Sequence, residues 1–121
     1  MRKLLFIFAL FLASTAGPQK LLHYDLADGL SSSEITSICE NDYYMWIATE
    51  DGLNRFDGHR FKVYKSGKAT NNSLKNNNIE TLFLDSKGLL WIGFKTGGVD
   101  IYNPRTDQFT HLNEQVSEPI P

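Results

Sequence analysis

A block that occurs twice constrains the fold of this chain more than any other feature. The first copy carries Trp46-Ile-Ala and then Gly52, and the second carries Trp91-Ile-Gly and then Gly97. The two tryptophans are 45 positions apart, and so are these two glycines. A period of this length, built from short β segments, is typical of stacked or radial repeat architectures. One repeat cannot bury its apolar face alone, and about three or more are usually needed for a stable stack. We therefore expect this chain to be the beginning of a larger protein.

Each copy is predicted to form four short antiparallel strands. The segments are rich in β-branched and aromatic residues and are separated by Gly, Asn and Asp, which is the pattern of strands joined by turns. The predicted strands are residues 35–40, 45–49, 53–57 and 61–65 in the first repeat, and 79–84, 89–94, 99–102 and 109–112 in the second. Four-stranded repeats of this kind are the blades of a β-propeller, which needs about four to eight of them to close. The predicted fold is all-β, with about two propeller-type blades.

Glycines and tryptophans are the expected structural residues of the repeat. Asp51-Gly52 and Gly97-Gly98 supply the positive φ that tight hairpin turns require. Asp85-Ser-Lys-Gly88 is a polar four-residue connection suited to a hairpin. The set comprises Trp46, Trp91, Gly52, Gly88, Gly93 and Gly97.

A partial third copy precedes the first repeat. The segment Leu21-Leu-His-Tyr24 is similar to the two predicted fourth strands, at residues 61–64 and 109–112. The propeller is therefore expected to be incomplete, with one N-terminal strand that lacks the first three strands of its blade. The chain divides into a signal peptide (1–16), the N-terminal fourth-strand segment with a linker (17–32), repeat 1 (33–65), a polar inter-repeat loop (66–77), which we expect to be solvated, repeat 2 (78–112), and a tail or linker (113–121).

The N-terminus has the order of parts of a secretory signal peptide. A basic start is followed by an apolar run from Leu4 to Ala13 and by the small residues Ser14-Thr-Ala16. The apolar run is about half the roughly 20 residues that a membrane-spanning helix needs. We expect cleavage after Ala16, export to the periplasm and no membrane span in this chain. Cleavage leaves 10 basic and 14 acidic residues, a net charge of −4, without a basic patch, so nucleic acid is a poor candidate partner.

Aromatic and cationic residues are the candidates for ligand binding. A tryptophan face can stack on a sugar ring, but Trp46 and Trp91 recur at one repeat position, which favours a role in packing between blades. Tyr43 and Tyr44 stand at a short predicted hairpin tip and are the first candidate binding residues. Arg55 and Lys95 are further candidates near a blade edge.

No pattern of reactive residues indicates an enzyme, a metal site or a cofactor. The three histidines lack metal-ligand spacing. Cys39 is the single cysteine, so the chain has no internal disulfide, and its place in an apolar strand predicts a buried, inert thiol. No nucleophile motif and no suitably spaced pair of carboxylates is present.

The repeats resemble those of the two-component regulator propeller family. The resemblance rests on Asp85-Ser-Lys-Gly-Leu-Leu-Trp-Ile-Gly93, on Asp28-Gly-Leu-Ser31 and on the run from Trp46 to Gly58, and it covers about residues 21–112. It implies a propeller that forms the periplasmic sensor of a hybrid two-component system, chiefly in Bacteroidetes, and that recognises oligosaccharides released from a complex glycan. In that family a membrane helix passes the signal to a cytoplasmic histidine kinase, and the usual output is control of polysaccharide-utilisation genes.

Three functional hypotheses follow from these observations. This sequence holds no kinase segment and no further blade, so the first hypothesis is the N-terminal part of a ligand-sensing propeller. The second is a truncated or stand-alone interaction fragment without signalling activity, which self-associates or pairs with further blades through its open strand edges. The third and weakest is a secreted propeller enzyme, because propellers also host enzymes.

Overall fold

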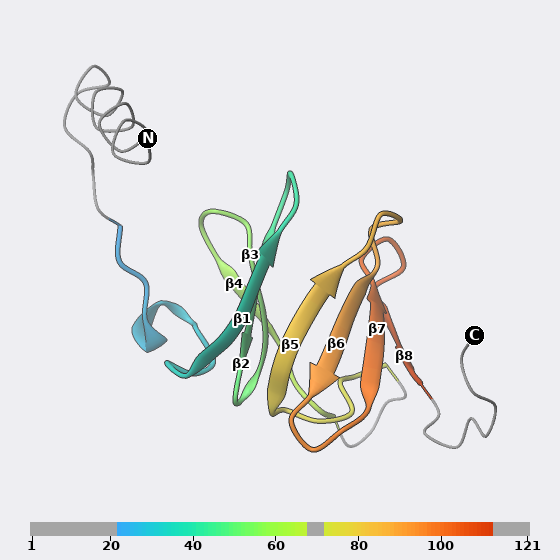
Figure 1. Cartoon of the computed structure of the whole chain (residues 1–121). Helices are drawn as coiled ribbons and strands as arrows, with labels where there is room; N and C mark the ends of the chain where they lie inside the picture. The colour runs from blue at the N-terminus through green and yellow to red at the C-terminus, as the bar shows by residue number, and fades with distance from the viewer. Residues whose placement is uncertain (1–21, 68–71, 113–121) are drawn as a thin grey trace, which may run out of the picture.

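The computed structural model describes residues 22–67 and 72–112, and within them it shows two four-stranded antiparallel sheets (Figure 1). Each sheet has its strands in chain order, so each is a meander in which every strand pairs with the next. The predicted all-β fold with four-stranded blades is confirmed. The strands are β1 (Ile35–Glu40), β2 (Met45–Thr49), β3 (Gly52–Phe56) and β4 (Phe61–Tyr64) in the first sheet, and β5 (Ile79–Leu84), β6 (Leu90–Phe94), β7 (Val99–Asn103) and β8 (Gln108–His111) in the second.

The predicted strands agree with the observed ones to within one residue at each end. This agreement has a local cause, because the strands are rich in β-branched and aromatic residues and stop at glycine-containing or Asx turns. The two sheets pack face to face, and β1 and β2 of the first sheet contact β5 of the second (Figure 1). Equivalent strands therefore hold equivalent places in two consecutive blades.

A cluster of aromatic side chains fills the space between the two sheets. Trp46 and Tyr64 from the first sheet meet Tyr102 and Phe109 from the second, and Trp46 and Tyr102 are fully buried. The rings of Trp46 and Tyr102 lie edge to face with centroids 5.4 Å apart, an arrangement that aromatic pairs favour. The hydroxyl groups of Tyr64 and Tyr102 lie 3.1 Å apart, within hydrogen-bond distance. The core of the molecule is thus the interface between the repeats.

The connection that leads into each sheet is anchored by a buried leucine and a polar side chain. Leu74 is 2% exposed, and the backbone N–H of the following residue, Lys75, donates to Asp100 Oδ2 at 2.9 Å. In the first repeat Leu30 is buried, and the N–H of Ser31 donates to Asn54 Oδ1 at 3.0 Å. The prediction of a solvated inter-repeat loop is wrong at Leu74, because this residue closes the apolar core beside the second sheet.

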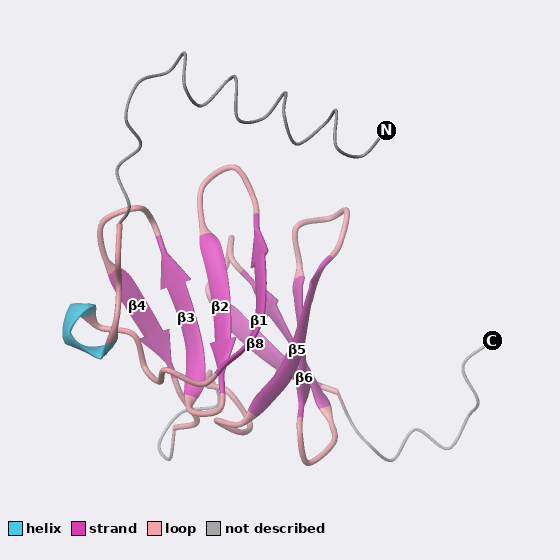
Figure 2. Cartoon of the chain, turned by 60° about the vertical axis from the view of Figure 1, so that its left-hand side comes forward, coloured by secondary structure: helices cyan, strands magenta, loops and turns pink. Residues whose placement is uncertain are grey.

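The predicted N-terminal fourth strand, which lacks the first three strands of its blade, stays a prediction: Leu22–Tyr24 pair with no strand among the described residues, and Leu21 lies outside them. Neither described sheet offers this segment a third strand, because β3 pairs with β2 and β4, and β7 pairs with β6 and β8. Tyr24 instead packs edge to face against Phe56, with ring centroids 4.7 Å apart. A single 3-10 turn, η1 (Leu26–Asp28), follows and lies beside the first sheet, on the side away from the second sheet (Figures 1 and 2).

Two further predictions fall on residues that the structure does not describe. The signal peptide (1–16) and the tail (113–121) both lie outside the described ranges. Within those ranges, no helix has the length and apolar character needed to cross a membrane.

Candidate functional site

Four turns gather at one end of the two sheets. Because the strands run antiparallel, the β1–β2, β3–β4, β5–β6 and β7–β8 turns share one end, at the top of Figure 1. We call this end the odd-turn end, formed by the turn residues 41–44, 57–60, 85–89 and 104–107. The β2–β3 and β6–β7 turns lie at the opposite end.

Side chains of Asn and Asp fix the shape of two turns at the odd-turn end. Asn41 Oδ1 accepts the backbone N–H groups of Tyr43 at 2.9 Å and Tyr44 at 2.8 Å. Asp85 Oδ1 accepts those of Lys87 and Leu89, both at 2.9 Å. Such side-chain to backbone bonds hold a turn in one conformation, so both hairpin tips are preorganised.

The four repeat glycines have two different structural roles. Gly52 has a φ of 119°, and a Cβ there would lie 3.0 Å from the carbonyl oxygen of the last residue of β4. Gly97, in the equivalent turn, and Gly88, in the β5–β6 turn, also have positive φ values of 99° and 85°. Gly93 instead allows the side chain of Thr81 on the neighbouring strand to come close, because a Cβ at Gly93 would lie 2.9 Å from Cγ2 of Thr81.

The carboxylate of Asp85 connects the β5–β6 turn to Trp91. Its Oδ2 accepts the indole N–H of Trp91 at 2.9 Å. This hydrogen bond, followed by those from the backbone of Leu89 and Lys87, lowers the pKa of Asp85 below its ordinary value of 3.8. All three bonds favour the ionised carboxylate. Ionised Asp85 therefore stabilises the turn that forms one side of the groove described below.

Replacing Asp85 with asparagine is expected to break the bond to Trp91 while leaving an acceptor for the turn. Because the folded pKa of Asp85 is depressed, its stabilisation is fully present above the unfolded pKa and is lost as pH falls below about 3.8. In wild-type protein the indole N–H resonance of Trp91 should shift in that acid range. In Asp85→Asn the Trp91 indole N–H resonance should differ from its wild-type position already at neutral pH, and it should not shift in the acid range. NMR titration measures both, and an unchanged acid shift in Asp85→Asn would contradict the assignment.

A groove opens between the two sheets at the odd-turn end. Its volume is about 360 Å³, and it draws on the β1–β2, β5–β6 and β7–β8 turns of both repeats. Exposed aromatic surface, an amide and two cations line it, a combination suited to a polar ligand with an apolar ring face. The lining residues are Asn41, Tyr43, Tyr44, Lys87, Gly88, Pro104 and Arg105.

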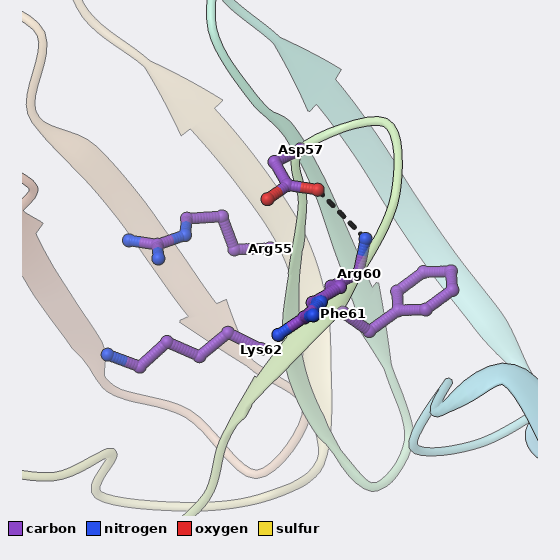
Figure 3. Close-up of a pocket in the computed structure, with 5 residues that line it drawn as sticks. All are labelled: Arg55, Asp57, Arg60, Phe61 and Lys62. Atoms are coloured by element: carbon purple, nitrogen blue, oxygen red, sulfur yellow. Dashed lines mark hydrogen bonds between the residues drawn. The ribbon is translucent and has the colours of Figure 1, made fainter.

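A second hollow lies beside the groove on the first sheet. The guanidinium carbon of Arg55 stands 4.4 Å from the ring centroid of Tyr44, in a cation–π contact. The hollow, of about 210 Å³, is lined by Arg55, Asp57, Arg60, Phe61 and Lys62 (Figure 3). Arg55 and Lys62 extend to one side of the sheet and Phe61 to the other (Figure 3).

The structure separates one predicted binding residue from the other three. Tyr43 is 78% exposed at the hairpin tip, and the next residue, Tyr44, contacts Arg55 at the same end. Lys95 instead follows β6, so it lies in the β6–β7 turn at the opposite end. The sequence did not identify four further cations that line the groove or the hollow together with Tyr43, Tyr44 and Arg55. These cations are Arg60, Lys62, Lys87 and Arg105. Each lies in a turn at that end or within two residues of one, which is the signal that identifies them.

The two repeat tryptophans have different environments. Trp46 is fully buried between the sheets, where its face is inaccessible to a ligand. Trp91 is half-buried on the other face of the second sheet and pairs in register with Phe83, which is 63% exposed. The same repeat position therefore packs against a neighbouring blade in one case and faces outward in the other.

Among the described residues, reactive groups away from the odd-turn end form no further candidate site. Cys39 is half-buried, and burial raises the pKa of its thiol, which favours the less reactive protonated form. In the part of the chain that the structure describes, no three His, Cys, Asp or Glu side chains are grouped to hold a metal ion.

A family model described as "Two component regulator propeller" matches residues 29–51 and 73–96. Both matched segments contain the buried anchor leucine and the first two strands of a blade. The repeat unit of this family therefore begins in the connection before each sheet.

Solved structures with a similar fold are extracellular domains of bacterial signalling proteins. The extracellular domain of the hybrid two-component system BT3049 from B. thetaiotaomicron superposes with a TM-score of 0.73 and 27% identity, over 84% of this chain and 14% of that one. The extracellular domain of the one-component system BT4673 from the same organism gives a TM-score of 0.62 at 23% identity, over 79% of this chain and 14% of that one. At 23% identity, the similarity to BT4673 shows only that the two folds are alike.

Among curated proteins, Histidine kinase P4 of Formosa agariphila is 42% identical over 48 residues, which are 39% of this chain. The chain spans only 4% of the length of that relative.

Proposed function

We propose, from the premise that this chain is built of two-component regulator propeller repeats, that it forms part of an extracellular sensor domain and binds an oligosaccharide at its odd-turn end. The main support for the proposal is the groove, which is lined by Tyr43 and Tyr44 of the first repeat and by turns of the second repeat. A tyrosine presents a flat apolar face with a polar tip, which suits a sugar ring. A site formed by two blades also responds to their relative position.

The proposed location is the periplasm, reached by cleavage after Ala16. Support comes from the basic, apolar and small-residue order of the N-terminus and from the extracellular origin of the similar solved domains. Binding in the periplasm would be read out by a histidine kinase, and the proposed output is control of polysaccharide utilisation. This chain spans 14% of the similar solved extracellular domain, so the proposed readout is that of a complete sensor of which this chain would form one part.

A second role, pairing with further propeller blades, is favoured by the outer face of the second sheet. Phe83, Trp91 and Ile101 are consecutive partners across β5, β6 and β7, and Phe83 is 63% exposed. The same register in the first sheet holds Cys39 and Trp46 against the neighbouring blade. This role is compatible with ligand binding, because the outer face and the groove are different surfaces.

Replacing Tyr43 with alanine is expected to weaken oligosaccharide binding about five- to thirtyfold, the effect of losing about 1–2 kcal/mol at an aromatic contact. Tyr43 is 78% exposed, so the fold should persist. Isothermal titration calorimetry against a panel of neutral and acidic oligosaccharides measures the change. Lys95→Ala, at the opposite end, is the matched control and should bind as wild type does. If Tyr43→Ala binds as wild type does and Lys95→Ala does not bind, the site lies at the end opposite to the one proposed. If no oligosaccharide of the panel binds, the proposed ligand class is rejected.

A further inference from the structure

Two cations face each other on neighbouring strands of the first sheet. Arg55 of β3 and Lys62 of β4 are direct partners in the antiparallel register. Both side chains extend to the same side of the sheet (Figure 3). Like charges directly opposite each other on paired strands are destabilising. Such a pair therefore requires a physical reason.

No carboxylate neutralises this pair within residues 22–67 and 72–112. The ion pairs found there involve other residues, such as Lys65 with Asp51 at 2.9 Å. Arg55 and Lys62 each lie over an aromatic ring instead, that of Tyr44 at 4.4 Å and that of Tyr64 at 5.1 Å. The rings position the two cations but leave their charge in place.

The second repeat shows that the fold does not need charges at these positions. In the first sheet the register runs from Trp46 to Arg55 and Lys62. In the second sheet the same register runs from Trp91 to Ile101 and Thr110. An apolar residue and a neutral residue thus occupy the equivalent places. The cationic pair is a property of the first repeat alone, so packing of the repeat does not explain it.

The hollow around the pair carries a net positive charge. Arg60 adds a third cation, and Asp57 is the single carboxylate of the lining (Figure 3). Asp57 Oδ1 accepts the backbone N–H groups of His59 and Arg60, both at 2.8 Å, so this oxygen is occupied in holding the β3–β4 turn. Three cations against one anion leave two positive charges in the hollow. The overall chain, by contrast, carries −2.

The surroundings of the hollow differ in charge from one side to the other. The groove between the sheets adds Lys87 and Arg105 and no carboxylate. Glu40 and Asp42 line an adjoining hollow with Phe56, which shares Tyr43 and Tyr44 with the groove and Asp57 with the cationic hollow. Phe56 pairs with Phe61, whose ring points away from Arg55 and Lys62 (Figure 3). Arg55 and Lys62 thus extend to the side of the sheet opposite to Phe61, and the lining of the nearby groove adds cations only.

We propose that Arg55, Arg60 and Lys62 bind an anionic group, a carboxylate or a sulfate, carried by the saccharide ligand. This inference rests on the proposed function and specifies its substrate class as acidic saccharides. Arginine donates to carboxylate and sulfate oxygens in a fork, and lysine acts as a point charge. An anion bound between the two strands removes the repulsion of the like-charged pair. Tyr43 and Tyr44 lie beside the hollow and contact the sugar rings.

The decisive experiment exchanges the pair for the residues of the second repeat. Wild type, Arg55→Ile/Lys62→Thr and the control Lys95→Thr are titrated by calorimetry with tetragalacturonate and with its fully methyl-esterified, neutral form. A sulfated galactan tetrasaccharide and its desulfated form are the second pair. Wild type and Lys95→Thr should bind one acidic form at least about tenfold more tightly than its neutral partner. The double variant should lose that preference. The anion is a carboxylate if the galacturonates show the preference for the acidic form, and a sulfate if the galactans show it.

Two outcomes separate failure of this inference from failure of the proposed function. If neutral and acidic forms bind equally well, or the double variant keeps the preference for the acidic form, the anion site is rejected while saccharide binding stands. If no saccharide binds, charged or neutral, both are rejected.

A measurement without ligand tests the repulsion itself. Lys62→Thr should raise the Tm relative to wild type at about 20 mM salt, and the gain should shrink at about 1 M salt, where charges are screened beyond about 3 Å. Lys95→Thr should show no such salt-dependent difference. A Tm difference for Lys62→Thr that does not depend on salt would overturn the argument from the like-charged pair.

Discussion

Replacing Trp46 with alanine is expected to lower the free energy of unfolding by about 3–5 kcal/mol, the range for removing a large buried aromatic side chain. Trp46 is fully buried and its ring meets those of Tyr64 and Tyr102, so the substitution opens a cavity between the two sheets. Trp91→Ala is the matched control, because it removes the same side chain from the same repeat position where it is only half-buried. Urea unfolding followed by circular dichroism measures both.

The comparison between the two tryptophans is the informative result. Trp46→Ala should lower the free energy of unfolding clearly more than Trp91→Ala does, although Trp91→Ala also removes the hydrogen bond to Asp85. Trp46→Phe keeps an aromatic ring in the interface, and the Trp46 indole N–H has no partner among the described residues, so this variant should be milder and stay folded. Equal losses for the two alanine variants would mean that the face-to-face packing of the sheets is wrong.

Replacing Leu74 with alanine is expected to cost about 2–5 kcal/mol, although sequence alone places it in a polar loop. Leu74 is 2% exposed, and its neighbour Lys75 is held through its backbone N–H by fully buried Asp100. Shortening the side chain leaves a void and loosens the anchor of the connection. Leu26→Ala is the matched control, because Leu26 is 56% exposed and its loss should change stability by no more than about 0.5 kcal/mol. Thermal and urea unfolding of both variants provide the comparison.

The Leu74 prediction also tests whether the connection belongs to the repeat. If Leu74→Ala is as mild as Leu26→Ala, the connection is a passive linker. A large loss confirms that each blade includes the segment before its first strand.

Local patterns explain why the eight strands were predictable from the sequence. Runs of β-branched and aromatic residues and the Asx and glycine turns that separate them act within a few residues of each other. Features that depend on distant partners were not predictable. The segment Leu22–Tyr24 has the residues of a fourth strand, but forming one requires a third strand from another blade, because β3 already pairs on both sides. The burial of Leu74 likewise depends on a core that two sheets build together.

The candidate site was predictable in part for the same reason. Tyr43, Tyr44 and Arg55 were identified by residue type, and the structure brings them to one end. Lys95 lies at the other end because it follows the second strand of its blade, whereas the turns of the odd-turn end follow the first and third strands. This alternation follows from antiparallel pairing. The opposition of Arg55 and Lys62 also follows from the predicted strands once their register is fixed by the Asp57-Gly58 turn.

The site spans two repeats, so the account depends on the two sheets forming one unit. Fluorine NMR of the chain labelled with 5-fluorotryptophan tests this directly, because Trp46 reports the interface and Trp91 reports the outer face of the second sheet. Urea is raised stepwise and both native signals are followed, with Trp91→Phe used for assignment. The packing of the sheets predicts that the two signals disappear with the same midpoint. Two separate midpoints would show that the repeats unfold independently, and would contradict a binding site that both of them build.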